Sequence, residues 1–258
     1  MKTRRRFRLL VVALASGLSL AVASRGHAKD ADSVFGSSSK GEGGALIGIL
    51  YDLKQTQQRQ PTKETPASYR GVITEFLKSG WDEEILNRYF RVTRPLYTTR
   101  IWIPMMNADE APKAFGVADV VKPRMWVVHY KGQVAPPESG LYRFSGMADD
   151  IIAVRVNDRL VLVSGRPDCL PPASVWKSPE PKGRDGTTSG DWIALKAGET
   201  VDMDVIVGER PGGRFGAELS VEKQGEPTAG RKPPMFSLGA GPAAGSAAPA
   251  WSVWQAKQ

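Results

Sequence analysis

Two adjacent carboxylates, Asp149 and Asp150, are the sharpest candidates for chemistry in this sequence of 258 residues. They interrupt an apolar run, because Ala148 precedes them and Ile151 follows them. Carboxylates beside apolar neighbours are costly unless a cation, an amide or water satisfies them. The pair therefore predicts either a bound cation or a structural turn in which the acids accept hydrogen bonds from backbone amides.

Histidine and cysteine are too scarce for most other kinds of site. His27 falls in an N-terminal segment that we expect to be removed, which leaves His129 as the one histidine of the mature chain. A His-rich zinc site is therefore excluded, and a mid-strand position with no nucleophile motif nearby favours a structural His129. Cys169, the one cysteine, cannot form an intramolecular disulfide. We interpret it as incidental, and as a site of unwanted dimerisation.

A long segment, Ser164–Asp191, is rich in Pro, Gly, Ser and Lys and predicts a loop. Loops of this length inside a compact domain are often functional. The indole of Trp176 in this loop could stack on the apolar face of a sugar ring. It could equally cover one end of the fold as a lid, and the sequence leaves both interpretations open.

The elements around the acid pair are β-strands. Between Trp126 and Val163 the sequence predicts four strands, because short apolar runs alternate with turns of Pro, Gly, Asn and Asp. The last two, Ile151–Val156 and Leu160–Val163, are expected to pair across Asn157-Asp158 as a hairpin.

A second hairpin is expected nearer the C-terminus. Val201–Val207 and Arg214–Glu222 alternate apolar and polar residues on either side of a Gly-rich turn. Asp202 and Asp204 would then form a solvated row on the exposed face of the sheet. Further strands are expected at Ala45–Leu53, Leu96–Ile103 and Trp192–Leu195, and helices at Ala67–Ser79, at Asp82–Phe90 and within Asn107–Val117.

The middle of the chain resembles the protective-antigen-type (PA14) β-sandwich domain, a module of toxins, yeast adhesins and bacterial glycosidases. The order is a strand ending in Gly, then P-x-S-G-x-Y-x-F, then Asp-Asp, then a hairpin with a polar turn. An L-x-A-G-E run before the last strands adds to the resemblance, which covers Gly44–Gln224 apart from an insertion at Lys54–Phe90. The matching residues of the middle part are Gly132, Pro137, Ser139, Gly140, Tyr142, Phe144, Asp149 and Asp150.

This resemblance implies an all-β fold, an antiparallel β-sandwich of jelly-roll type with short helical insertions. It also implies carbohydrate binding, for which Asp149, Asp150 and Trp176 are the expected ligand-binding residues. In the adhesin branch the matching acid pair coordinates calcium, which then binds sugar hydroxyls. Because Ca²⁺ takes about six to eight oxygens, a second loop would have to supply more of them. Family members without calcium there keep the acid pair as a turn, and this alternative stays open. The acids available in the long loop are Asp168, Asp185 and Asp191.

The N-terminus predicts a secretory signal peptide. A basic start is followed by the uncharged run Leu9–Ala23 and by a small residue at Ala28, after which cleavage is expected. An uncleaved membrane anchor is the alternative. Six of the 35 Lys and Arg precede Lys29 and no acid does, so the mature chain would hold 29 bases against 27 acids, a net charge of +2. No basic stripe then remains that would bind nucleic acid.

The sequence thus predicts a signal peptide at 1–28, a flexible leader at 29–43, a sandwich domain at 44–224 and a Gly/Pro/Ala-rich tail at 225–258. The favoured function is an exported, non-enzymatic module that binds a glycan or cell-surface polysaccharide, with calcium as its cofactor. We expect it in the periplasm or at the cell surface, with no transmembrane segment once the signal is cleaved. Two alternatives remain. One is a structural or assembly protein of the cell envelope that binds a protein partner, and the other is a glycoside hydrolase that uses carboxylates.

Overall fold

The structure is a computed structural model that describes residues 33–41, 44–183, 185–226, 232–239 and 251–253. The expected signal peptide lies outside these residues. The described residues all belong to one compact unit.

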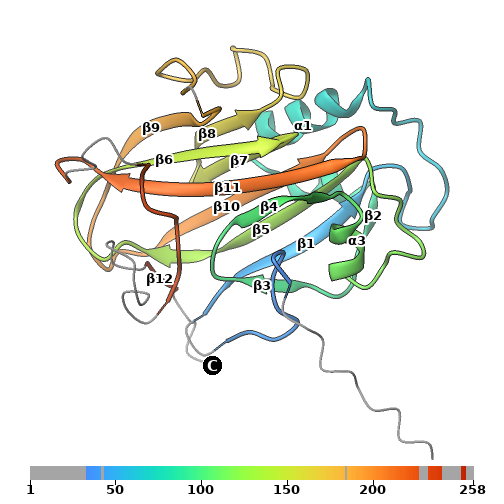
Figure 1. Cartoon of the computed structure of the whole chain (residues 1–258), viewed down its shortest axis with the longest axis horizontal. Helices are drawn as coiled ribbons and strands as arrows, with labels where there is room; N and C mark the ends of the chain where they lie inside the picture. Colours follow the sequence, from blue (N-terminus) through green and yellow to red (C-terminus); the bar gives the residue numbers. More distant parts are fainter. Residues whose placement is uncertain (1–32, 42–43, 184, 227–231, 240–250, 254–258) are drawn as a thin grey trace, which may run out of the picture. The chain divides into compact units, whose positions relative to one another are not determined.

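Two antiparallel sheets form a β-sandwich, as expected (Figure 1). Among the described residues, the larger sheet has eight strands in the order β2-β1-β5-β10-β7-β8, with β3 beside β1 and β12 beside β5. These strands are β1 (Leu46–Asp52), β2 (Phe90–Arg91), β3 (Leu96–Thr98), β5 (Trp126–Ala135), β7 (Ile151–Val156), β8 (Arg159–Gly165), β10 (Val201–Glu209) and β12 (Ser252–Val253). The smaller sheet, counted over the same described residues, has four strands. Their order is β4 (Trp102–Asn107), β11 (Arg214–Lys223), β6 (Gly140–Asp149) and β9 (Thr188–Leu195).

Alternating apolar side chains explain why the two sheets pack face to face. Val128, Val154 and Val205 of the larger sheet meet Phe144 and Leu219 of the smaller sheet in one apolar cluster, and all five are fully buried. Successive residues of a strand point to opposite faces of its sheet. The residues that alternate with these five along each strand therefore point to the outer faces of the two sheets.

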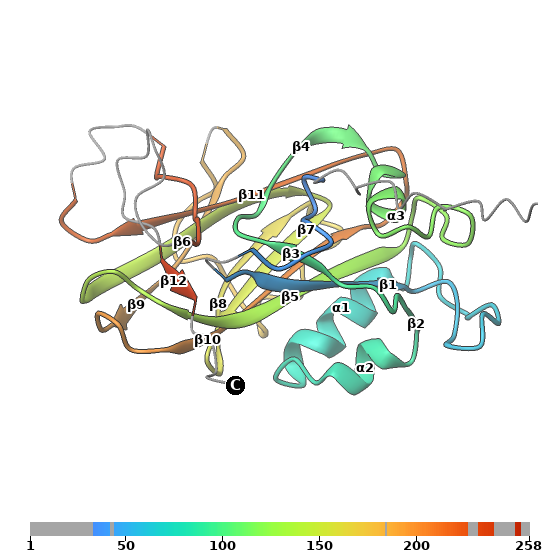
Figure 2. The same ribbon diagram turned by 90° about the horizontal axis from the view of Figure 1, so that it is seen from below.

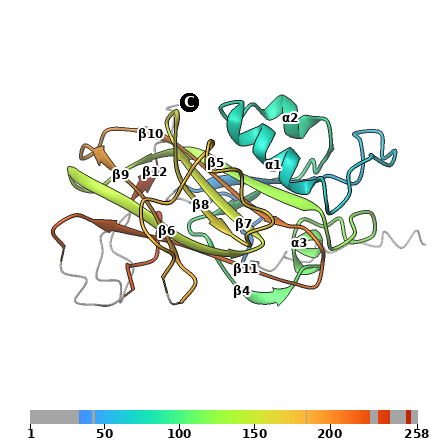
Figure 3. The same cartoon turned by 90° about the horizontal axis from the view of Figure 1, so that it is seen from above.

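Helices cover the outer face of the larger sheet. Figures 2 and 3 show α1 (Tyr69–Lys78) and α2 (Glu83–Asn87) packed beside it, on the side away from β11 and β4. Phe76 of α1 shares a second apolar cluster with Ile49 and Ile206 of the sheet. Part of the outer face of the larger sheet is therefore buried as well: Asp204, expected in a solvated row, is buried there, whereas Asp202 is exposed.

The expected hairpin of Val201–Val207 and Arg214–Glu222 is wrong. Both segments are strands, but β10 belongs to the larger sheet and β11 to the smaller one. Both edges of β10 are already paired, one with β5 and the other with β7. The chain that follows β10 therefore crosses to the other sheet, and the Gly-rich turn connects two layers.

The expected strand Leu96–Ile103 is divided in the same way. Its first part is β3, which pairs with β1, whereas its end belongs to β4, which pairs with β11 in the other sheet. Between them the hydroxyl of Thr98 donates to the carbonyl of Arg100 at 2.6 Å, as the chain turns from one layer to the other. A short helix, α3 (Glu110–Ala114), follows β4.

Described residues of both flanking segments contribute side chains to the core. Phe35, in the expected flexible leader, is buried against Trp126 at a ring-centroid distance of 6.2 Å. Phe236 and Trp251, in the expected tail, are buried against each other at 5.6 Å. These side chains are apolar and large, and their burial outweighs the Gly- and Pro-rich composition around them. Trp254, the other tryptophan of this tail, lies outside the described residues.

Candidate ligand-binding site

The acid pair lies where the chain crosses between the sheets. Asp149 is the last residue of β6, and Asp150 precedes the first residue of β7 in the other sheet. The peptide bond between the two acids is cis. The crossing from β10 to β11 lies at the same rim, because Asp149 pairs with Gly216 near the start of β11. The backbone N–H of Arg210 donates to Asp150 Oδ2 at 2.7 Å and joins the two crossings.

Asp150 combines burial with an unsatisfied oxygen. Its Oδ1 is buried and accepts no hydrogen bond. Burial raises the pKa of Asp150 to about 6, and the neighbouring carboxylate of Asp149 adds to the increase. The side chain of Asp149, by contrast, is 31% exposed. The pair therefore offers one buried and one accessible carboxylate to a cation or a hydrogen-bond donor.

A third acid, Glu209, lies buried at the other crossing and was not anticipated from the sequence. Its Oε1 accepts a hydrogen bond from Gly212 N at 2.6 Å, whereas its Oε2 is buried and accepts none. Burial raises the pKa of Glu209 to about 8, and the charge of Asp150 contributes. Its signal in the sequence is the same as that of Asp149: an acid that directly follows an apolar strand and precedes a turn.

The long loop after β8 reaches the acid pair, as expected. The backbone N–H of Arg166 donates to the carbonyl of Asp150 at 2.8 Å. The guanidinium of Arg166 lies within ion-pair distance of Asp149, Asp150 and Asp168, and Arg210 pairs with Asp168 as well. The loop thus brings one acid and one base to the site.

Two other acids of this segment are not part of the site. Asp185 accepts hydrogen bonds from the backbone and the hydroxyl of Thr187 at 3.0 and 2.9 Å. Asp191 pairs with Arg159 at 3.4 Å. Of the three loop acids considered as further ligands, Asp168 alone joins the ion-pair network of the acid pair.

A cleft of about 420 Å³ opens beside Asp149. Its charged lining comes from Asp149, Arg166, Lys182 and Glu218. Trp102 and Met105 of β4 contribute apolar lining. Trp102 is 37% exposed and Met105 is 48% exposed, which is unusual for large apolar side chains. An apolar surface next to convergent polar groups is the usual composition of a small-molecule site.

Trp176 lies in a neighbouring pocket of about 290 Å³, which shares Gly165 and Lys182 with the cleft. Its ring is partly buried and packs against both apolar clusters. Its indole N–H is buried and donates no hydrogen bond. This is the arrangement expected of a lid over the end of the sandwich, and a role of Trp176 in sugar binding stays a prediction.

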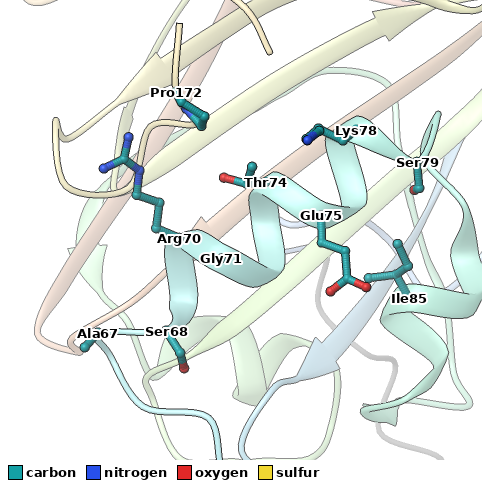
Figure 4. Close-up of a pocket in the computed structure, with 10 residues that line it drawn as sticks. All are labelled: Ala67, Ser68, Arg70, Gly71, Thr74, Glu75, Lys78, Ser79, Ile85 and Pro172. Atoms are coloured by element: carbon teal, nitrogen blue, oxygen red, sulfur yellow. The ribbon is translucent and has the colours of Figure 1, made fainter. Parts of the chain in front are cut away.

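The largest hollow among those described is a shallow groove along α1, of about 890 Å³. Figure 4 shows Arg70, Thr74 and Lys78 along one side of the helix, with Pro172 of the long loop near Arg70. None of the residues singled out in the sequence lines this groove. Basic side chains at this spacing on a solvated helix face are ordinary surface chemistry, so the site is assigned to the cleft.

His129 has a structural position, as expected, and Cys169 is buried in the core. His129 is buried beneath the helices, where its Nε2 lies 2.7 Å from Asp204 Oδ1. Cys169 is fully buried, and burial raises the pKa of its thiol to about 12. The unwanted dimerisation through Cys169 does not fit this burial, because a buried thiol with a high pKa is unreactive.

Residues 117–231 match the family model described as the PA14 domain. The chain therefore contains a PA14 domain. The matched residues include β5 to β11, and with them the acid pair and the long loop. A search of the curated proteins found no match.

Several solved structures are similar to this PA14 protein. The PA14 sugar-binding domain from an RTX adhesin is 14% identical, with 70% of this chain and 91% of that chain covered and a TM-score of 0.44. The epithelial adhesin 6 A domain from Candida glabrata, in complex with Galβ1-3GlcNAc, is 14% identical over 83% and 88% of the two chains, with a TM-score of 0.43. The PA14 domain of the MpAFP antifreeze protein is 13% identical over 76% and 87%, with a TM-score of 0.42. At this level of similarity no site residue is transferred from them.

The described residues offer few clusters of metal ligands. Within the described part of the chain, no three His, Cys, Asp or Glu side chains gather in an arrangement that could hold a metal ion. The buried, unsatisfied Oδ1 of Asp150 and the accessible carboxylate of Asp149 nevertheless fit a calcium ion that takes its other oxygens from carbonyls, water or ligand hydroxyls. No helix among the described residues is long and apolar enough to cross a membrane.

Proposed function

We propose that this PA14 protein is a non-enzymatic carbohydrate-binding module whose site is the cleft beside Asp149. The observation that carries the proposal is the meeting of an accessible carboxylate with two exposed apolar side chains, Trp102 and Met105, in one cleft. A pyranose ring has apolar C–H faces and a rim of hydroxyl groups. The apolar side chains suit the ring face, and the carboxylate suits the hydroxyl donors.

Calcium is the second part of the proposal. Asp149 and Asp150 would hold the ion, and the bound ion would supply positive charge that attracts hydroxyl oxygens of the sugar. Support comes from the buried Oδ1 of Asp150, which accepts no hydrogen bond and whose nearest cation, Arg166 Nε, lies only at ion-pair distance, 3.5 Å away.

A glycan array, probed with calcium and again with a chelator, tests both parts. We expect binding that is lost when the chelator is added. Binding that persists in the chelator would contradict the calcium part of the proposal and leave the carbohydrate part standing. The absence of binding in both conditions would overturn the carbohydrate proposal. Asp149→Asn is expected to weaken binding at least tenfold, whereas Asp158→Asn, on the exposed β7–β8 turn, serves as the matched control.

We also propose that the protein is exported, to the periplasm or the cell surface. The basic start and the uncharged run Leu9–Ala23 support this proposal. Sequencing of the N-terminus of the protein purified from its native host tests it, and a chain that begins at Lys29 is expected.

A further inference from the structure

Arg166 is held beside the acid pair by its backbone and only loosely by its side chain. Its N–H bonds to the carbonyl of Asp150, directly after Gly165 pairs with Ile151 at the end of the β7–β8 ladder. The side chain is 56% exposed. The strand pairing therefore fixes where the guanidinium is tethered but leaves it free to move.

The guanidinium occupies the region that a metal ion would need. Its Nε lies 3.5 Å from Asp150 Oδ1 and 3.9 Å from Asp168 Oδ1, and its Nη1 lies 3.7 Å from Asp149 Oδ1. These separations are ion-pair contacts and exceed the distance of about 2.8 Å typical of charge-assisted hydrogen bonds. Arg166 thus compensates both acids of the pair without satisfying the buried oxygen of Asp150.

A divalent ion and this guanidinium cannot use the same oxygens together. Calcium binds carboxylate oxygens at about 2.3–2.6 Å, so an ion on Asp149 and Asp150 would lie against the Arg166 cation. Like charges at such short range repel strongly, above all next to a buried group. Binding of the ion therefore requires that the Arg166 side chain swing away, toward the cleft that it already lines.

We propose that Arg166 is a built-in competitor of the divalent ion at Asp149 and Asp150, and that it lowers the calcium affinity of the site. This inference rests on the calcium part of the proposed function. The positive charge of Arg166 balances the charge of the two acids in the absence of metal, so that calcium binds when its concentration is high.

Titration of the full chain with calcium chloride in a calorimeter tests the competition. Arg166→Gln removes the charge, and we expect its Kd for calcium to be at least tenfold lower than that of the unsubstituted protein. Arg159→Gln is the matched control, because Arg159 is 57% exposed and pairs with one acid away from the site. Its Kd is expected to stay unchanged.

Arg166→Lys separates charge from structure. The lysine keeps a positive charge beside the acids, and its Kd is expected to stay within about threefold of the unsubstituted protein. Equal affinities of Arg166→Gln and the unsubstituted protein would overturn the competition and leave the calcium site standing. A lysine variant that binds calcium as tightly as the glutamine variant would overturn it too. If neither the unsubstituted protein nor any variant binds calcium, both the competition and the calcium site are contradicted. The glycan array in the presence of chelator then tests carbohydrate binding separately.

Discussion

His129 Nε2 lies 2.7 Å from Asp204 Oδ1 beneath the helices that cover the larger sheet, and both side chains are buried. Arg155 pairs with the other carboxylate oxygen of Asp204 at 2.7 Å and also donates to the carbonyl of Gly80, between α1 and α2. Three neighbouring strands thus present one polar network to the helical insertion. The network anchors the α1–α2 connection to the sheet.

We expect Asp204→Ala to destabilise the protein by about 3 kcal/mol, because it leaves a buried histidine and a partly buried arginine without their acceptor. Asp202→Ala is the control on the same strand, where the acid is exposed and accepts a bond from Gln133. Its cost should stay below about 1 kcal/mol. Urea unfolding followed by tryptophan fluorescence measures both, and similar midpoints for the two variants would contradict the anchoring role.

The alternation of apolar residues was sufficient to predict most strands, but not the sheet to which each belongs. Gly208–Gly213 has the composition of a hairpin turn, yet Gly208 is still paired within β10 and residues 210–213 carry the chain from one layer to the other. The composition of a turn specifies its local conformation, whereas the pairing of β10 depends on β5 and β7, which are distant in the sequence. For the same reason the sequence did not reveal that α1 and α2 would bury Asp204.

The candidate site was predictable in part. Asp149 and Asp150 stand out because two acids interrupt an apolar run, and the adjacency of the long loop followed from its length. Arg166 and Trp102 were not anticipated, since an exposed arginine in a loop and a tryptophan in a strand are ordinary in sequence. Their importance comes from the cleft that brings them to Asp149, and that proximity is a property of the packed sheets.

Gly165 is required where the loop leaves β8. Its φ is +152°, and a Cβ at this position would lie 2.0 Å from the carbonyl oxygen of Asp150. Gly165→Ala is therefore expected to lower the melting temperature by several degrees and to weaken ligand binding, because the backbone next to the acid pair must move. Gly71→Ala is the control, since it has open space within α1 and should be neutral or stabilising. Equal melting temperatures for the two variants would contradict the requirement.

Because two acids are buried, we expect the stability of the folded protein to fall as the pH rises. The pKa of Glu209 is raised to about 8 from 4.5, and that of Asp150 to about 6 from 3.8. Between the ordinary and the raised pKa the folded protein holds protons that the unfolded chain has released. These two acids therefore lower the free energy of unfolding as the pH rises from about 3.8, where Asp150 begins to contribute, to about 8. Thermal unfolding in metal-free buffer measures this slope.

Glu209→Gln isolates the contribution of this acid. The amide keeps an oxygen that can accept the bond from Gly212 N but carries no charge at any pH. We expect a flatter pH profile and a higher melting temperature than the unsubstituted protein at pH 8. Glu199→Gln, an exposed substitution, should leave the profile as it is. A slope unchanged in the Glu209 variant would show that its carboxyl ionises without cost.

We expect the thiol of Cys169 not to react with a disulfide reagent in the folded protein. It is fully buried and its pKa is raised to about 12 by burial, so the thiolate is scarce and inaccessible. A chromogenic disulfide reagent at pH 8 should release less than a tenth of one equivalent from the native protein and one equivalent in denaturant. As the chain has one cysteine, the signal reports Cys169 alone. Rapid native labelling would contradict the packing around this residue.

We expect the sugar ring to bind against the side chain of Trp102. Trp102→Ala removes an exposed aromatic surface from the cleft, and we expect at least tenfold weaker binding of the array glycan that gives the strongest signal. Trp192→Ala is the matched control, because Trp192 lies on β9, stacks with Arg143 at 4.6 Å and does not line the cleft. Trp176→Ala tests the neighbouring pocket. If Trp176→Ala abolishes binding while Trp102→Ala leaves the affinity unchanged, the sugar ring binds beneath the long loop instead of against β4.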